Sequence, residues 1–261
     1  MELKIATHNG IFHADEVTAI ALLKLFTDDA ISVQRLKHDT EDFSEYDMVI
    51  DIGRKFDGKK YFDHHQYKGG KSSAGLIWEY LNQENSYPNI IKLIKMVDAN
   101  DVGAIKAKPF EYPSLIKHFN SNGDIYSDKQ DLCFTKAVDF AFTVLQSMQH
   151  NEDAVVEAQS IVNNSFYFNG NKNIIELDRY TRFWSKYING QTMPNIKAVV
   201  WEDEADNSWK VKIPSKKPGS FELCSTALPC DDSMKFVHAN GFFAVAKDRE
   251  TLSLYLQKQY A

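Results

Sequence analysis

Short apolar runs alternate with helical segments through the first half of the chain, and this alternation restricts the fold more than any other feature. Strand-like runs are found at residues 3–6, 31–33, 48–50 and 60–62. Residues 17–26 carry apolar side chains at three- and four-residue steps, the period of a helix. Two more helices are expected at 73–83 and 89–99. Strands that alternate with helices predict a mostly parallel sheet flanked by helices, which is an α/β fold.

The sequence changes character near residue 123, after the loop-like stretch 120–124. A long helical stretch follows at 131–164. The remainder is typical of strands and one terminal helix, with strands at 174–177, 196–201, 209–213, 236–237 and 242–246 and the helix at 249–259. We predict a catalytic metal-binding domain over residues 1–128 and a smaller α+β substrate-binding domain over 129–261 that includes a long linking helical region. The active site is expected in the cleft between them.

Charge is distributed unevenly between these halves. The 261 residues hold 30 Lys and Arg and 36 Asp and Glu, a net charge of −6. Residues 1–128 carry 15 basic and 20 acidic side chains, whereas 129–261 carry 15 and 16. This acidity argues against a histone-like nucleic-acid binder, because phosphate affinity comes mainly from clustered Lys and Arg. It leaves room for an enzyme that holds phosphates with metal ions.

The composition and the cysteines favour a globular cytoplasmic protein. A hydrophobic fraction of 43% and a charged fraction of 25% exclude a disordered, collagen-like or coiled-coil chain. No apolar run is long enough to span a membrane, and the start of the chain has a strand pattern in place of a signal peptide. Cys133, Cys224 and Cys230 form no CxxC pair, which argues against a disulfide framework and a cysteine zinc site.

Histidine and aspartate concentrate where predicted strands and one predicted helix end. Four segments share this property: 8–16, Asp51, 63–65 and 98–101. In an open α/β sheet, ligands bind outside the carboxyl ends of the strands, and the first three segments would lie there. Carboxylates mixed with imidazoles suit Mn²⁺, Fe²⁺ or Zn²⁺ better than Ca²⁺. At least six candidate ligands suit two ions bridged by a carboxylate, with Asp51 the natural bridge.

Each segment taken alone also has an ordinary structural interpretation. Asp51 could be a turn residue, and His64 and His65 could be incidental surface residues. Asp98 and Asp101 could be solvated carboxylates at the end of a helix. Their joint occurrence at one predicted edge is what favours a metal site.

Several motifs together resemble a known family. The chain contains Thr7-His8-Asn9-Gly10-Ile11-Phe12-His13-Ala14-Asp15-Glu16, Asp63-His64-His65-Gln66 and Ser72-Ser73-Ala74-Gly75. Near its end it contains Pro218-Gly219-Ser220-Phe221 and Phe236-Val237-His238-Ala239-Asn240-Gly241-Phe242. These motifs resemble the DHH phosphoesterase superfamily, and most closely its melanocyte-proliferating-gene branch of metal-dependent 3′–5′ exonuclease-like proteins. The resemblance covers almost the whole chain.

The resemblance implies a site for two divalent ions. Mn²⁺ is favoured, with Mg²⁺, Fe²⁺ or Zn²⁺ as alternatives. One ion would be held by His8, His13 and Asp51, and the other by Asp15, Asp51, His64 and Asp98. The broader superfamily usually has an aspartate where this chain has His13, and Asp101 is an alternative to Asp98. The implied nucleophile is a metal-activated water.

Three residues are expected to take part in catalysis, namely Asp51, Asp63 and His65. Asp51 would bridge the ions. Asp63 would accept the free N–H of a ligating imidazole and so fix its tautomer. His65 would donate a hydrogen bond to the phosphate or the leaving oxygen.

Substrate-binding residues are expected mainly in the second half. Lys210 and Lys212 point to one face of a strand and, if they are not simply solvated, suit the backbone of a single strand. His238 and Asn240 lie in a turn that the resemblance assigns to the substrate side. Ser73 begins a helix whose N-terminus can assist a phosphate.

The leading functional prediction is a metal-dependent hydrolase, a phosphodiesterase or 3′–5′ exonuclease acting on RNA or short oligonucleotides. One alternative is a hydrolase of small phosphates, such as a pyrophosphatase or a cyclic-dinucleotide phosphodiesterase. Another is a metal-binding regulatory protein without turnover. No membrane partner is expected, and a homo-oligomer is left open.

Overall fold

The chain forms two compact units, residues 1–152 and 153–261. The computed structural model describes residues 2–83 and 86–260. Helix α5 (Asp128–Asn163) begins where the predicted domain boundary falls, and the division between the two units lies within this helix.

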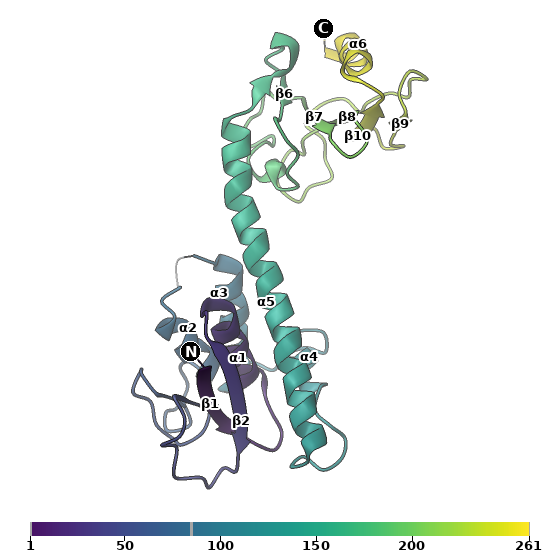
Figure 1. Cartoon of the computed structure of the whole chain (residues 1–261). Coiled ribbons are helices and arrows are strands. Elements are labelled where there is room, and N and C mark those ends of the chain that lie inside the picture. Colours follow the sequence, from purple (N-terminus) through teal and green to yellow (C-terminus); the bar gives the residue numbers. More distant parts are fainter. Residues whose placement is uncertain (1, 84–85, 261) are drawn as a thin grey trace. The chain divides into compact units, whose positions relative to one another are not determined.

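The first unit is built on a four-stranded parallel sheet (Figure 1). Its strands are β1 (Glu2–His8), β2 (Ala30–Leu36), β3 (Met48–Ile50) and β4 (Tyr61–Phe62), in the order β2-β1-β3-β4. Ile5 of β1 pairs with Val33 on one side and with Met48 on the other. After β1 the chain adds β2 on one side of it and then crosses to add β3 and β4 on the other side. Ligands bind at the point where the strand order reverses in this way.

Side chains alternate strictly between the two faces of this sheet. Ile5, Ile50 and Phe62 pack into the main core, whereas their neighbours Ala6 and Val49 belong to a small cluster on the opposite face. This period of two is the pattern of a strand buried on both sides. The predicted α/β fold is confirmed.

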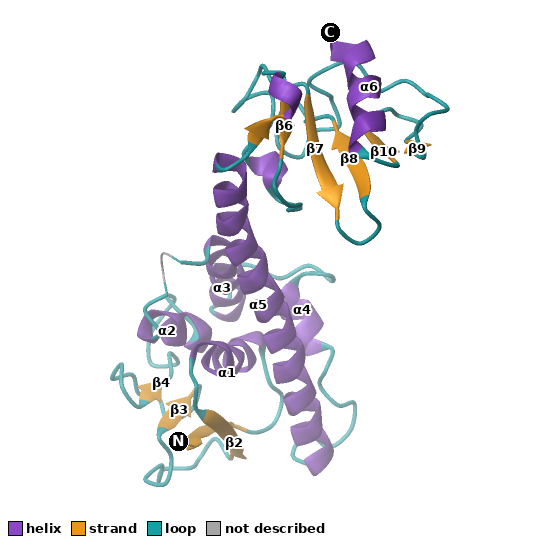
Figure 2. Cartoon of the chain, turned by 45° about the horizontal axis from the view of Figure 1, so that its top comes forward, coloured by secondary structure: helices purple, strands orange, loops and turns teal. Residues whose placement is uncertain are grey.

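Helices cover one face of the sheet, as Figure 2 shows. They are α1 (Ala14–Phe26), α2 (Ser73–Tyr80), α3 (Pro88–Asp101), the short α4 (Tyr112–Lys117) and the first part of α5. The loop that joins β2 to β3 carries Phe43, which packs against the opposite face of the sheet. The flanking helices that the sequence predicts therefore lie on one face, and the connections from β2 to β3 and from β3 to β4 are loops.

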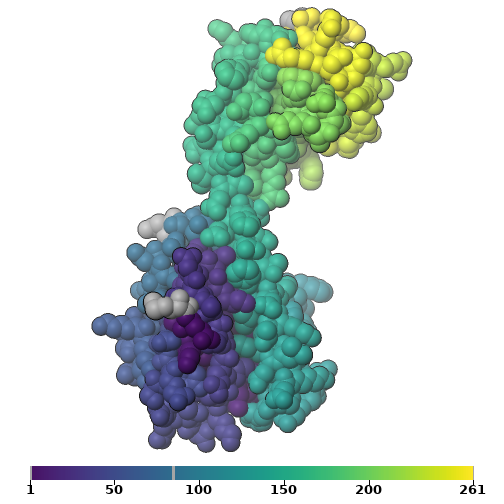
Figure 3. All heavy atoms as spheres, viewed as in Figure 1, coloured from purple at the N-terminus to yellow at the C-terminus, as the bar shows by residue number. Residues whose placement is uncertain are grey.

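The second unit is a six-stranded mixed sheet with a terminal helix, drawn in green to yellow in Figure 3. Its strands are β5 (Phe166–Tyr167), β6 (Ile174–Glu176), β7 (Ala198–Asp203), β8 (Ser208–Lys212), β9 (Phe236–Val237) and β10 (Phe243–Ala246), in the order β5-β6-β7-β8-β10-β9. Short 3₁₀ turns lie at Phe168–Gly170 and Trp184–Lys186. Helix α6 (Arg249–Tyr260) buries Leu252 and Tyr255 against the sheet. A smaller α+β unit was predicted here, and it is confirmed.

Two sequence expectations outside the site can also be checked. Cys133, Cys224 and Cys230 are free thiols. Among the described residues, no helix has both the length and the apolar character to cross a membrane.

Candidate metal centre

The strands deliver several candidate ligands to one buried edge. His8 is the last residue of β1, Asp51 directly follows β3, and Asp63 directly follows β4. All three side chains are buried. Asp51 has a φ of 57°, in the left-handed region that costs most side chains free energy. Aspartate is among the few residues that tolerate this conformation, so the backbone itself favours an aspartate directly after β3.

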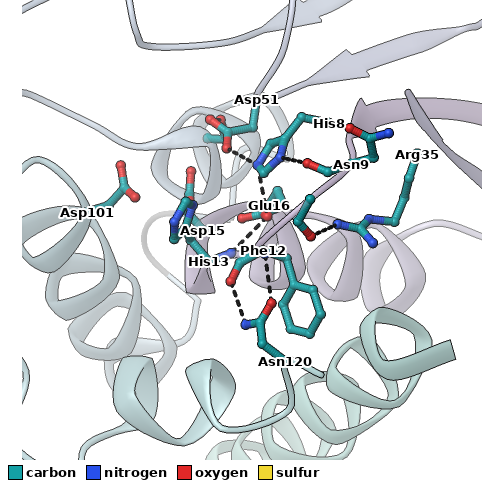
Figure 4. A network of polar contacts seen from close by, with 12 residues as sticks. His8, Asn9, Phe12, His13, Asp15, Glu16, Arg35, Asp51, Asp101 and Asn120 are labelled. Carbon is teal, nitrogen blue, oxygen red and sulfur yellow. Dashed lines mark hydrogen bonds and ion pairs between the residues drawn. The ribbon is translucent and has the colours of Figure 1, made fainter. Parts of the chain in front are cut away.

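The ring of His8 lies between two carboxylates (Figure 4). Its Nε2 is 3.1 Å from Oε1 of Glu16 and 3.3 Å from Oδ2 of Asp51, and its Nδ1 is 2.8 Å from the carbonyl oxygen of Asn9. Burial disfavours a charged ring, but the two carboxylates outweigh that cost and raise the pKa of His8 to about 11. The site therefore strongly stabilises positive charge.

The ring of His64 occupies the other side of Asp51. Its Nε2 is 3.4 Å from Oδ1 of Asp51, 3.0 Å from Oδ2 of Asp101 and 3.7 Å from Oδ2 of Asp15. Burial opposes protonation of His64, but Asp101 and Asp51 raise its pKa to about 10. Asp51 thus directs Oδ2 toward His8 and Oδ1 toward His64, which is the arrangement a bridging carboxylate requires.

Asp15 is the least compensated group in this cluster. It is fully buried, and neither of its carboxylate oxygens has a hydrogen-bond partner among the described residues. Burial, followed by repulsion from Asp51 and Glu16, raises the pKa of Asp15 well above its usual range. Buried carboxylates are normally paired or bound to metal. A divalent cation would supply the missing partner, so the residues present fit the implied metals.

Three groups of side chains bring their ligand atoms within 4.8 Å of one another. They are His8 with His13, Glu16 and Asp51; Asp51 with His64 and His65; and His13 with Asp15 and Asp101. Asp51 and His13 each belong to two groups, so the groups form one continuous cluster. The cluster can hold metal ions, and the donor set of imidazoles and carboxylates matches transition metals.

Asp98 and Asp101 have different surroundings although they are one helical turn apart on α3. Oδ1 of Asp98 accepts hydrogen bonds from the backbone N–H of Ser72 at 2.9 Å and from its hydroxyl at 2.7 Å. The same carboxylate lies so close to Gly75 that a Cβ there would be 2.5 Å from it. Asp98 therefore anchors the start of α2. In the described part of the chain it belongs to none of the three groups, whereas Asp101 does.

His65 lies at the rim of the cluster and is half-exposed. Its Nδ1 is 2.8 Å from Oδ1 of Asp63 and 3.5 Å from Oδ1 of Asp51. The hydrogen bond to Asp63 is the main cause of a raised pKa for His65. Asp63 was expected to accept a hydrogen bond from the imidazole of a metal ligand. Its imidazole partner is His65, at the rim of the cluster. Ser73 donates its hydroxyl to Oδ1 of Asp51 at 3.0 Å, so it lies beside the candidate bridge.

Sequence reasoning assigned no role to Glu16 or His38. Glu16 is buried, accepts the backbone N–H of His13 at 2.9 Å and approaches His8. A glutamate three residues after a helix N-cap is a capping-box signal that could have identified it. His38 stacks on His8 with ring centroids 4.7 Å apart. No sequence signal identifies His38, because it follows β2 with no neighbouring ligand type except Asp39.

The candidate substrate residues of the second unit separate into two sets. Lys212 and Asn240 line a cavity of about 500 Å³ whose walls include the rings of Trp184, Phe221 and Phe242. Lys210 forms an ion pair with Asp203. His238 accepts the backbone N–H of Asn240 at 3.1 Å and packs against Phe242, with 4.3 Å between the ring centroids. Lys212 and Asn240 therefore share a cavity, while Lys210 and His238 have local partners.

A family model described as the MYG1 exonuclease family, "Uncharacterised protein family (UPF0160)", matches residues 4–258. The chain belongs to this family. A "MYG1 protein" of Schizosaccharomyces pombe is 27% identical over 305 residues, which cover 92% of each chain. "MYG1 exonuclease" of Homo sapiens is 24% identical over 317 residues, covering 95% of this chain and 83% of the human one. A "MYG1 protein" of Chlamydia muridarum is 36% identical over 129 residues, 44% of each chain.

Membership of the MYG1 exonuclease family confirms the resemblance that the sequence motifs indicated. The exonuclease name of the human relative agrees with the predicted hydrolase class. A crystal structure of an uncharacterized protein from Helicobacter pylori G27 aligns with 99% of this chain and 98% of that one at 10% identity. Its TM-score of 0.27 is too low to inform the fold.

Proposed function

We propose that this MYG1-family chain is a metal-dependent phosphodiesterase that removes nucleotides from the 3′ end of RNA or short oligonucleotides. The observation that carries the proposal is the position of Asp51. Its two carboxylate oxygens face two different histidines within one buried cluster of ligand atoms. Two cations that share one carboxylate are the arrangement used to cleave phosphoesters.

The ligands would divide between two positions. His8, His13 and Asp51 would hold one ion. Asp15, Asp51, His64 and Asp101 would hold the other, with Asp101 in the role first given to Asp98. Bound divalent ions of the Mn²⁺ type would supply Lewis-acid activation of water and of the phosphate.

The rim residues would act on the substrate directly. Asp63 holds Nδ1 of His65, which leaves Nε2 as the ring atom that can face the substrate, where a second proton would make the ring a cation. Nε2 of that form is a charged donor, and it can stabilise negative charge on a phosphate or on the leaving oxygen. Asp63 is then a positioning residue.

The cavity of the second unit suits a nucleobase and its phosphate. Lys212 lies 5.8 Å from the ring centroids of both Trp184 and Phe242. Aromatic rings that surround a cation combine stacking with phosphate contact, the combination typical of single-strand binding. Asn240 adds an amide that can hydrogen-bond to a base edge.

The test is to incubate the Mn²⁺-loaded protein with RNA labelled at its 5′ end and to read product length over time. We expect a ladder that shortens one nucleotide at a time and depends on added metal. Turnover of pyrophosphate or cyclic dinucleotides without any shortening of RNA would support the small-phosphate alternative. Metal binding without turnover of any of these substrates would support the regulatory alternative.

A further inference from the structure

A second cavity, of about 790 Å³, lies in the first unit and is lined by positive charge. Its walls include three lysines and one histidine, namely Lys106, Lys108, Lys117 and His118. The described residues that line it include no acid. This contrasts with the acidic metal centre of the same unit.

Among the residues that the structure describes, these basic side chains have no partner. Within residues 2–83 and 86–260, none of the four forms an ion pair or a side-chain hydrogen bond, whereas Lys24, for example, pairs with Asp139 at 2.9 Å. The nearby acid Glu111 accepts the backbone N–H of Lys108 at 2.8 Å. Three lysines around one concave surface give it a positive potential that attracts anions.

The cavity wall is tied to the metal centre by hydrogen bonds. Asn120, a lining residue, accepts the backbone N–H of Phe12 and donates to its carbonyl oxygen, both at 3.0 Å (Figure 4). Gln130 donates to Oδ1 of Asn120 at 2.6 Å and to the carbonyl oxygen of Gly10 at 2.9 Å. Phe12 precedes His13, so these bonds fix the wall relative to a candidate ligand.

Two segments of this wall lie next to candidate metal ligands in the sequence. Ile11 lines the cavity from the loop that carries His8 and His13. The segment 106–109 lines it from the loop that follows Asp101, at the end of α3. Both loops therefore carry a candidate ligand of the metal centre and a wall residue of the basic cavity.

We propose that this cavity binds the phosphate backbone of a nucleic-acid strand whose terminal nucleotide occupies the metal centre. The inference rests on the proposed nuclease function and assigns part of substrate binding to the first unit. Three lysines that form no ion pair among the described residues suit several phosphates in sequence better than a single compact anion. Phe110, adjacent to the lining residue Pro109, is 90% exposed and offers a stacking surface for a base.

The test is a triple substitution, Lys106→Gln with Lys108→Gln and Lys117→Gln. The matched control is Lys92→Gln with Lys95→Gln and Lys136→Gln, which removes the same charge from exposed positions of the same unit. We expect the cavity variant to raise the KM for an RNA of about a dozen nucleotides by roughly tenfold or more. The kcat/KM for a dinucleotide should fall less than about twofold, because too few phosphates remain to reach the cavity.

Salt dependence gives a second readout that needs no turnover. Binding of a cleavage-resistant phosphorothioate RNA should weaken with salt, and the slope of log Kd against log salt should decrease by about two in the cavity variant. Equal losses in the cavity and control variants, or equal losses on the dinucleotide and the longer RNA, would overturn the proposal. Inorganic phosphate that displaces the RNA only at very high concentration would support a strand over a single anion.

The two proposals can fail separately. If the unmodified protein binds the phosphorothioate RNA through the lysines but shortens no RNA, the cavity stands and the nuclease function fails. If it shortens RNA and the cavity variant behaves as the control does, the nuclease function stands and the cavity fails. Phe110→Ala provides a variant that changes no charge, and it should weaken RNA binding by about tenfold. Unchanged RNA affinity in that variant would overturn the stacking role of Phe110.

Discussion

The candidate metal centre of the first unit and the aromatic cavity of the second unit differ in how deeply their side chains are buried. Asp15 and Asp51 are almost completely buried, and the carboxylate of Asp15 has no hydrogen-bond partner among the described residues. Phe221 and Lys212 instead line the aromatic cavity, and Phe221 is fully exposed. Removing a buried carboxylate that holds a cation should abolish hydrolysis. Removing one exposed ring should only weaken binding of the substrate. Substitutions in the two regions should therefore differ in kind as well as in size.

The largest effect is expected from Asp51→Asn. An amide keeps the shape and tolerates the left-handed backbone, but it cannot bridge two cations as a carboxylate does. We expect hydrolysis to fall at least about a thousandfold while the far-ultraviolet circular dichroism is unchanged. Asp57→Asn is the matched control, because Asp57 is a turn carboxylate between β3 and β4 whose partners among the described residues are three backbone N–H groups and a neighbouring lysine. Near-normal activity of Asp51→Asn would remove the bridging role.

The next largest effect is expected on Mn²⁺ affinity, and it distinguishes Asp101 from Asp98. Asp101→Ala should weaken Mn²⁺ binding by about 10–100-fold, because His64 and Asp15 lose a neighbouring carboxylate. Asp98→Ala should instead lower the free energy of unfolding by about 1–3 kcal/mol, because two donors of Ser72 lose their acceptor. Isothermal titration with Mn²⁺ and urea unfolding measure the two quantities. The reverse result would return Asp98 to the ligand set.

A smaller effect is expected on thermal stability when metal is added. A ligand that binds only the folded state stabilises it by about 2.7 kcal/mol at a hundred times its Kd, or roughly 5–10 °C for a domain of this size. Mn²⁺ should raise the Tm of the chelator-treated protein by that amount, because the clustered carboxylates then gain a counter-charge. Asp51→Asn should show little of this increase. An identical increase in that variant would place metal binding elsewhere.

The smallest effect is expected from Phe221→Ala in the second unit. Losing one stacking surface should weaken binding of a short RNA by about tenfold and leave hydrolysis of a small chromogenic phosphodiester unchanged. Phe166→Ala is the control, because Phe166 is an exposed ring of β5 that does not line this cavity. Equal losses for both variants, or a loss on the small ester, would argue against the aromatic cavity as a nucleotide site.

The sequence was sufficient for elements with a clear period or a clear end. Runs such as Met48–Ile50 and Tyr61–Phe62 are short, apolar and followed at once by aspartate, so their extents could be predicted to the residue or nearly so. Tyr112–Lys117 and Phe166–Tyr167 were not predicted, because six residues and two residues are too short to display a period. Phe43 covers the face of the first-unit sheet that has no helices. Its position depends on the path of a loop, which no local sequence pattern predicts.

The candidate site could be predicted as far as strand ends determine it. His8, Asp51 and His64 follow strands of one parallel sheet, so their proximity follows from topology. The choice between Asp98 and Asp101 could not be made, since residues three apart share a helix face. Their difference arises from the donors of Ser72, which come from another element and are visible only once the helices are packed.

The left-handed backbone at Asp51 has a consequence for how this position can evolve. Few residues other than Gly, Asn and Asp adopt that conformation at low cost, so the backbone already restricts the choice before any chemistry is considered. Of those three, only aspartate offers two charged oxygens. Under the proposed function, folding and catalysis would therefore both favour the same amino acid. A lineage that lost activity would still be held to three residues at this position by its fold.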